Sequence, residues 1–196
     1  MNSLNIDAAH TALVAIDLQN SNLERKLLPH SASLVLENSI KIADALRTKG
    51  GTVIWVRVDV GALLTLPADK PLSRPVGAPP PHPSASQLAP ALLERTTDTV
   101  VTKRNWGAFY GTDLDLHLQR GNIRTVIMAG IATNFGVEST ARGAFDRGYE
   151  LIFAEDAMSS VSTEMHQASN ERVFPHMGKV RATAEIVATL DRYIKR

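Results

Sequence analysis

The chain has no cysteine among its 196 residues. This absence excludes disulfide bonds, thiolate ligands for a metal and a thiol nucleophile. An excess of charge of one sign is also missing, because 21 Lys and Arg residues face 20 Asp and Glu residues. The composition therefore favours neither nucleic acid nor an anionic membrane as a partner. No apolar run approaches the roughly 18 residues of a membrane span, and no basic-then-apolar leader is present, so a soluble cytoplasmic protein is expected.

What is present is an alternation of two patterns. With 44% hydrophobic residues, the chain can bury one sizeable core, so residues 1–196 are expected to form a single domain. Short β-branched runs predict strands at Ala12–Leu18, Thr52–Asp59, Thr99–Lys103, Thr125–Gly130, Glu150–Glu155 and Lys179–Ala182. Between them, helices are predicted at Ala32–Lys49, Thr112–Arg120, Val137–Arg147, Thr163–Val173 and Thr183–Lys195. Such alternation indicates right-handed crossovers and a parallel sheet covered on both faces, hence an α/β fold.

One segment interrupts this pattern. Leu66–Pro90 holds eight of the ten prolines and includes Pro79-Pro80-Pro81. Such a run is incompatible with a regular helix or a central strand. Because both flanks belong to the same alternating pattern, we expect a long loop or lid rather than a linker between domains. This loop is expected to contribute to a subunit interface or to close a pocket.

Three polar or small-residue features follow separate predicted strands. Asp17 ends the first strand, Lys103 ends the third, and the turn Gly130–Gly136 follows the fourth. Ligands of open parallel sheets bind beyond the carboxyl ends of the strands. A turn that enters a helix also offers backbone N–H donors to a carboxylate or an oxyanion. Taken singly, Asp17 could instead be a helix-capping aspartate and Lys103 an exposed lysine.

Two longer motifs resemble those of a known superfamily. GIATNFGVESTAR at Gly130–Arg142 is similar to the signature G-[IV]-A-T-[DN]-x-C-V-x-x-T-A-R of the isochorismatase-like hydrolases, also called cysteine hydrolases. KRNWGAFYGTDL at Lys103–Leu114 is similar to the block K-x-x-x-[SG]-A-F-x-x-T-x-L of the same superfamily. The resemblance implies a three-layer α/β/α sandwich around a six-stranded parallel sheet. It also implies a homodimer or homotetramer and a non-proline cis peptide at Ile131–Ala132.

The resemblance also implies roles for the strand-end residues. Asp17 and Lys103 match the superfamily's Asp and Lys, but Gly136 stands where its amidases carry the nucleophilic Cys. Isochorismatases resemble this chain there, because they also carry Gly and hydrolyse a vinyl ether by general acid chemistry. Such chemistry needs a carboxylic acid with a raised pKa. Burial would raise the pKa of Asp17 and nearby Lys103 would lower it, and sequence leaves that balance open.

The leading hypothesis is therefore a small-molecule hydrolase that forms no covalent cysteine intermediate. In it, Asp17 is the general acid and base, Lys103 balances the charge, and the N–H groups of Ala132 and Gly136 bind an anion. The substrate is an enol ether such as isochorismate. The alternative is a disabled cysteine-hydrolase homologue, a pseudoenzyme that binds a small carboxylate or amide. The remaining candidate substrate contacts are Gln19, Asn20, Trp106, Phe109, Tyr110, Asn134 and Phe135.

A metal site is not expected from the sequence. Metal-binding nicotinamidases of this superfamily place an Asp and two His after the second strand. Asp59 is present here, but the loop after it offers only His82. We therefore predict no metal and no cofactor, and a small molecule as the partner.

Overall fold

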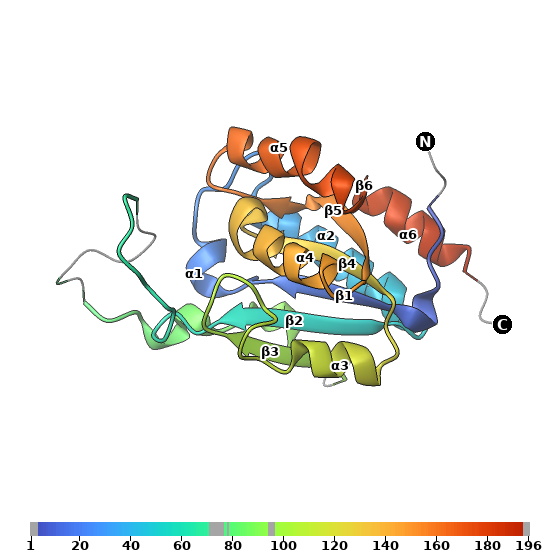
Figure 1. Ribbon diagram of the computed structural model, residues 1–196, viewed down its shortest axis with the longest axis horizontal. Helices are drawn as coiled ribbons and strands as arrows, with labels where there is room; N and C mark the ends of the chain where they lie inside the picture. Colours follow the sequence, from blue (N-terminus) through green and yellow to red (C-terminus); the bar gives the residue numbers. More distant parts are fainter. Residues whose placement is uncertain (1–3, 71–76, 78, 94–96, 194–196) are drawn as a thin grey trace.

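Six parallel strands form one sheet in the order β3-β2-β1-β4-β5-β6 (Figure 1). The structure is a computed structural model that describes residues 4–70, 77, 79–93 and 97–193. The strands are β1 (Thr11–Ile16), β2 (Thr52–Val58), β3 (Thr99–Lys103), β4 (Thr125–Ile131), β5 (Glu150–Ser159) and β6 (Gly178–Arg181). The predicted α/β fold with a six-stranded parallel sheet is confirmed.

Helices cover both faces of the sheet, and Figure 1 shows α2 and α4 on opposite sides. The helices are α1 (Asn20–Leu23), α2 (Ala32–Thr48), α3 (Leu114–Arg120), α4 (Glu138–Phe145), α5 (Thr163–Arg172) and α6 (Thr183–Asp191). A π-helical turn, Thr133–Val137, precedes α4, and short 3-10 turns lie at Ala8–His10, Pro83–Ser86, Pro90–Leu92 and Phe174–His176. Within the described ranges, no helix has the length and apolar character needed to cross a membrane.

The central strand β1 shows why two helical layers are needed. All six of its residues are buried. Leu13 and Ala15 pack in a core with residues of α2 and α6, whereas Val14 and Ile16 pack in a second core with residues of α3 and α4. Successive side chains of a strand point to opposite faces, so a strand that is apolar throughout is stable only between two layers.

The predicted elements agree with the structure within one or two residues, with four corrections. β5 extends to Ser159 rather than Glu155, because Met158 and Ser159 resume pairing with β4 after a register shift. The helix predicted from Val137 is preceded by the π turn and ends at Phe145. The short helix α1 was not predicted. The predicted end of the last helix, Lys195, lies outside the described residues, and α6 ends at Asp191.

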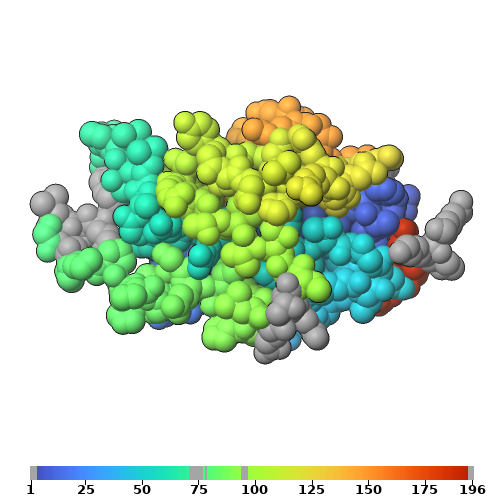
Figure 2. All heavy atoms as spheres, turned by 90° about the horizontal axis from the view of Figure 1, so that it is seen from below, coloured from blue at the N-terminus to red at the C-terminus, as the bar shows by residue number. Residues whose placement is uncertain are grey.

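The described parts of Leu66–Pro90 form neither a long helix nor a strand of the sheet. The 3-10 turn Pro83–Ser86 lies within it, a second, Pro90–Leu92, begins at its last residue, and both contain proline in their first positions. Residues 60–70 and 79–86 project together at one end of the molecule (Figures 1 and 2). This end lies beyond the carboxyl ends of β1 and β2, where the sequence places the candidate site.

Candidate active site

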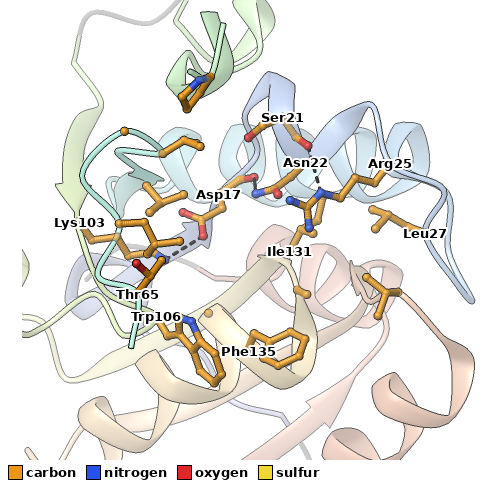
Figure 3. A pocket seen from close by; sticks show the side chains of 18 residues that line it. Asp17, Ser21, Asn22, Arg25, Leu27, Thr65, Lys103, Trp106, Ile131 and Phe135 are labelled. Atoms are coloured by element: carbon orange, nitrogen blue, oxygen red, sulfur yellow. Dashed lines mark hydrogen bonds and ion pairs between the residues drawn. The ribbon is translucent and has the colours of Figure 1, made fainter. Parts of the chain in front are cut away.

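Asp17 and Lys103 meet at the carboxyl edge of the sheet, as the sequence predicts. Asp17 follows β1 with a φ of +54°, and its N–H donates to the carbonyl of Val56 (2.7 Å). Lys103 ends β3, two strands away. Lys103 Nζ lies 2.8 Å from Asp17 Oδ2, with the two side chains 2% and 8% exposed, and Figure 3 shows this ion pair at the cavity wall.

Burial governs the protonation of Asp17. Removal of the Asp17 carboxyl from water raises its pKa to about 6, although Lys103 opposes the shift. Lys103 Nζ also donates to the carbonyl of Asn105 (3.1 Å). Asp17 Oδ1 is buried without a hydrogen-bond partner, so it is the carboxyl oxygen left to carry a proton. The site therefore holds a carboxyl group that exchanges a proton close to neutral pH.

Gly136 leaves an open position beside this pair. A Cβ atom at Gly136 would lie 3.3 Å from Asp17 Oδ2 and 3.5 Å from Lys103 Nζ. A cysteine at this position would thus begin its side chain against both catalytic candidates. Because glycine has no side chain, the space that a cysteine side chain would fill is part of the cavity. Gly136 and Ala132 line this cavity.

The turn before Gly136 depends on close backbone packing. Gly130 has a φ of +110°, and a Cβ there would overlap the backbone of Ile16 on the neighbouring strand, so only glycine fits. The peptide bond Ile131–Ala132 that follows is cis. Asn134, predicted as a substrate contact, instead accepts a hydrogen bond from Ser160 Oγ (2.5 Å) and does not line the cavity.

A cavity of about 450 Å³ opens in front of the Asp17–Lys103 pair. Apolar side chains form much of its wall, and Trp106 and Phe135 meet edge to face there with ring centroids 5.0 Å apart. Trp106 and Phe135, which were both predicted as substrate contacts, therefore line the cavity. The polar side chains that line it are Asp17, Ser21, Asn22, Arg25, Thr65 and Lys103. This volume and lining suit a small organic molecule.

Arg25 is the feature that sequence analysis missed. It follows α1, its Nε donates to the carbonyl of Ser21 (3.2 Å), and Figure 3 shows its guanidinium at the cavity wall. Asn22 lies beside it and donates to the carbonyl of Asp17 (3.1 Å). The one available signal is position, because residues just after β1 lie at the same sheet edge as Asp17. Arg25 and Lys103 are two cations around a cavity with one carboxylate, which favours an anionic ligand.

Gln19 and Asn20 do not line the cavity. The Gln19 side chain is fully buried and donates to the carbonyls of Val58 and Ala85, both at 3.0 Å, while its Oε1 accepts from Val58 N–H (2.7 Å). Asn20 Nδ2 donates to the carbonyl of Ser84 (3.2 Å). Both amides hold the Pro-rich segment against the sheet edge, so their predicted role as substrate contacts is corrected to a positioning one.

Two of the aromatic residues after Lys103 also point elsewhere. Phe109 stacks on Tyr149 at a centroid distance of 6.3 Å, and the Arg147 guanidinium lies 4.5 Å from the Phe109 ring centre. Tyr110 is 80% exposed and lines no part of the cavity. The prediction that Phe109 and Tyr110 wall the pocket is therefore wrong, because the loop after Trp106 turns them toward α4 and solvent.

Asp59 and His82 make separate local contacts. Asp59 Oδ1 accepts from the N–H of Gly61 (3.1 Å), and His82 Nδ1 lies 2.7 Å from Ser84 Oγ. In the part of the chain that the structure describes, neither belongs to a group of three metal-ligating side chains.

Comparison with known proteins identifies the family to which the chain belongs. The isochorismatase domain model matches residues 11–185. The chain is 44% identical over 191 residues to YwoC of Bacillus subtilis, an uncharacterized isochorismatase family protein, covering 95% of this chain and 97% of that one. It is 42% identical to the similarly described YecD of Escherichia coli O157:H7, covering 95% and 100%. An isochorismatase family protein from Burkholderia thailandensis superposes with a TM-score of 0.87 at 39% identity, covering 96% of this chain and 98% of that one. The chain belongs to the isochorismatase family of hydrolases.

Proposed function

We propose that the protein hydrolyses a small, carboxylate-bearing enol ether, such as isochorismate, without a covalent enzyme intermediate. The observation that carries this proposal is the pairing of a buried carboxyl group, Asp17, with an open position at Gly136. The first provides an acid, and the second removes the nucleophile that amidases of this superfamily use. An anion would bind at the backbone of Ala132 and Gly136 and at Arg25, all of which line the cavity.

The proposed reaction needs one group that gives and then recovers a proton. Protonated Asp17 transfers its proton to the terminal carbon of the enol ether, and the C=C electrons form the new C–H bond. The resulting oxocarbenium ion takes up a water molecule, whose proton returns to the Asp17 carboxylate. The hemiketal then breaks its C–O bond to give an alcohol and a carbonyl compound. Lys103, 2.8 Å from Asp17 Oδ2, stabilises the carboxylate between these steps.

A turnover assay separates this proposal from a pseudoenzyme. Purified protein is incubated with a panel of carboxylate-bearing enol ethers and of primary amides, and the products are followed by mass spectrometry. Turnover of enol ethers, with amides unchanged, supports the proposal. Binding of panel members by calorimetry with no turnover of any would establish the pseudoenzyme alternative, which the absence of a cysteine at Gly136 favours.

The activity is expected to fall as pH rises. Burial raises the pKa of Asp17 to about 6, so at pH 7 about a tenth of this group is protonated. For a general acid, kcat/KM should then fall about tenfold per pH unit above pH 6.

The stability of the fold should also decrease as pH rises. The pKa of Asp17 is higher in the folded than in the unfolded state, so protonated Asp17 contributes its full stabilisation below the unfolded-state pKa. This contribution is lost as pH rises through about 6. A kcat/KM profile and thermal melts from pH 4 to 8 test both; activity that increases above pH 7 would contradict the assignment.

Arg25→Gln should weaken substrate binding more than it slows the reaction. The substitution removes the charge that a substrate carboxylate would pair with, and a charge-assisted hydrogen bond is worth about 1.5–3 kcal/mol, which corresponds to about 10- to 100-fold in KM. Lys26→Gln is the matched control, because Lys26 is the adjacent exposed cation and does not line the cavity. Equal KM values for both variants and the wild type would remove Arg25 from the site.

We also propose that the chain assembles as a homodimer or homotetramer through its projecting end. Leu64 and Leu66 are 58% and 67% exposed, and they belong to residues 60–70, which extend away from the sheet (Figure 1). Apolar side chains exposed together on such an extension are typical of a subunit contact. Sedimentation velocity should show an oligomer that Leu64→Ser with Leu66→Ser dissociates. Leu116→Ser, on α3, is the control; a wild-type monomer would contradict the proposal.

A further inference from the structure

A second cluster of ionisable side chains lies outside the cavity. His30, from the loop before α2, and His166, from α5, both direct Nε2 at the same oxygen of Glu155, from β5. Both Nε2–Oε1 distances are 2.9 Å. We propose that His30, Glu155 and His166 bind a divalent metal ion of the zinc type. This inference is independent of the proposed reaction and departs from the sequence-based expectation of no metal.

The distances suit ligands of one ion. Zinc binds His nitrogen and carboxylate oxygen at about 2.0–2.2 Å, so neighbouring ligand atoms lie about 3 to 3.5 Å apart. The two 2.9 Å distances are close to this range, and the three ligand atoms all lie within 4.8 Å of one another. Two imidazoles and one carboxylate form a donor set that zinc takes in proteins, with a further position left for water.

A neighbouring contact orients the buried histidine. His166 is 1% exposed, and its Nδ1 lies 2.8 Å from Thr133 Oγ1, a buried hydroxyl in the turn before α4. Such a partner fixes the ring so that Nε2 faces the cluster, as metal-binding histidines require. His30 is held through its backbone, whose N–H donates to Ser159 Oγ (3.2 Å).

Asn170 adds an unsatisfied acceptor at the same place. Its Nδ2 donates to the carbonyl of His166 (3.0 Å) and also lies 3.1 Å from His166 Nε2. Its Oδ1 is buried and has no hydrogen-bond partner. Buried polar atoms without partners are uncommon, and a water on the metal is a donor of the kind this oxygen lacks.

The charge of the cluster also favours a cation. Glu155 places a carboxylate between the two imidazoles, because its Oε1 lies 2.9 Å from the Nε2 of both His30 and His166. The three residues come from separate parts of the chain, with His30 and Glu155 125 residues apart. β5 and α5 lie side by side in Figure 1, next to the turn that carries Gly136. A bound ion would therefore link the loop before α2, strand β5 and helix α5, and would stabilise their packing.

The test uses the full chain, without a histidine tag and treated with a chelator. Titration with ZnCl2 by calorimetry should show one equivalent bound, and Co²⁺ should give the visible absorption of a low-symmetry site. Outer partners of a metal site typically contribute about 10–100-fold in affinity, so loss of a ligand in His30→Ala should weaken binding by at least that factor. The wild-type melting temperature should rise with Zn²⁺, and that of His30→Ala should not.

His117→Ala is the matched control, because His117 also contacts a carboxylate, Asp113 Oδ2 at 3.2 Å, but on the exposed surface. Its affinity for Zn²⁺ should equal that of the wild type. Glu155→Gln is the second test variant, since it keeps the side-chain shape and removes the anionic ligand. Circular dichroism establishes that each variant is folded. Absence of Zn²⁺ binding to the wild-type protein would show that the cluster is a hydrogen-bonded network alone. Wild-type affinity for Zn²⁺ in both His30→Ala and Glu155→Gln would show the same.

Discussion

Asp17→Asn should lower kcat by about 10²–10⁴-fold, the usual contribution of a general acid and base. An amide cannot donate the acidic proton that the enol ether requires, although it occupies almost the same volume. The measurement is the initial rate on the best enol ether of the panel, below pH 6, where most of the wild-type Asp17 carries its proton because burial raises its pKa to about 6.

Two controls make this result interpretable. Asp146→Asn changes an exposed aspartate at the end of α4 and should leave the rate unchanged. Asp17→Asn also leaves the Lys103 ammonium buried without its counter-ion, which is destabilising. Thermal melts therefore establish the temperature range in which the variant is folded, and Asp17→Asn with Lys103→Met provides an inactive variant without the buried charge. Near-wild-type rates in folded Asp17→Asn would refute the mechanism.

Gly136→Cys should block binding of the native ligand and should not create an amidase. A Cβ at this position lies 3.0 Å from Ile16 Cγ2, so the neighbouring side chain must give way, and the Sγ would occupy cavity space. Overpacking of this kind typically costs about 1–3 kcal/mol, which corresponds to about 5- to 150-fold in affinity. Ligand affinity is measured by calorimetry for Gly136→Cys and for the smaller Gly136→Ala, which should show the milder loss.

The introduced thiol also provides its own chemical test. The wild-type chain has no cysteine, so iodoacetamide should leave its activity unchanged. In Gly136→Cys, the same reagent should modify one residue, beside Lys103, which favours the thiolate. Release of ammonia from any amide of the panel by this variant would instead identify the site as a disabled cysteine hydrolase.

Residues that follow predicted strands were placed correctly because their position depends on local pattern and on one topological rule. The apolar runs predict β1 and β3, the carboxyl ends of parallel strands lie at one edge, and both residues match the superfamily's Asp and Lys, so Asp17 and Lys103 were expected to meet. The resemblance to a known superfamily added Gly136, which the structure places beside both.

The predictions for loop residues were less accurate, because the direction of a loop side chain depends on contacts with residues that are distant in sequence. Trp106 and Phe109 are three residues apart, yet only Trp106 lines the cavity, while Phe109 packs against Tyr149. Gln19 directs its amide at the backbones of Val58 and Ala85, which no local pattern indicates. Arg25 reaches the cavity only because α1 forms after β1.

The sequence by itself determined the α/β class, the order of the strands along the chain and the absence of any thiol chemistry. It determined these because hydrophobic periodicity and composition are local properties. Only the tertiary structure shows that burial raises the pKa of Asp17 although Lys103 lies beside it. It alone also brought His30 and His166 to one oxygen of Glu155, because β5 continues past a register shift to Ser159 and the loop before α2 bonds to that end.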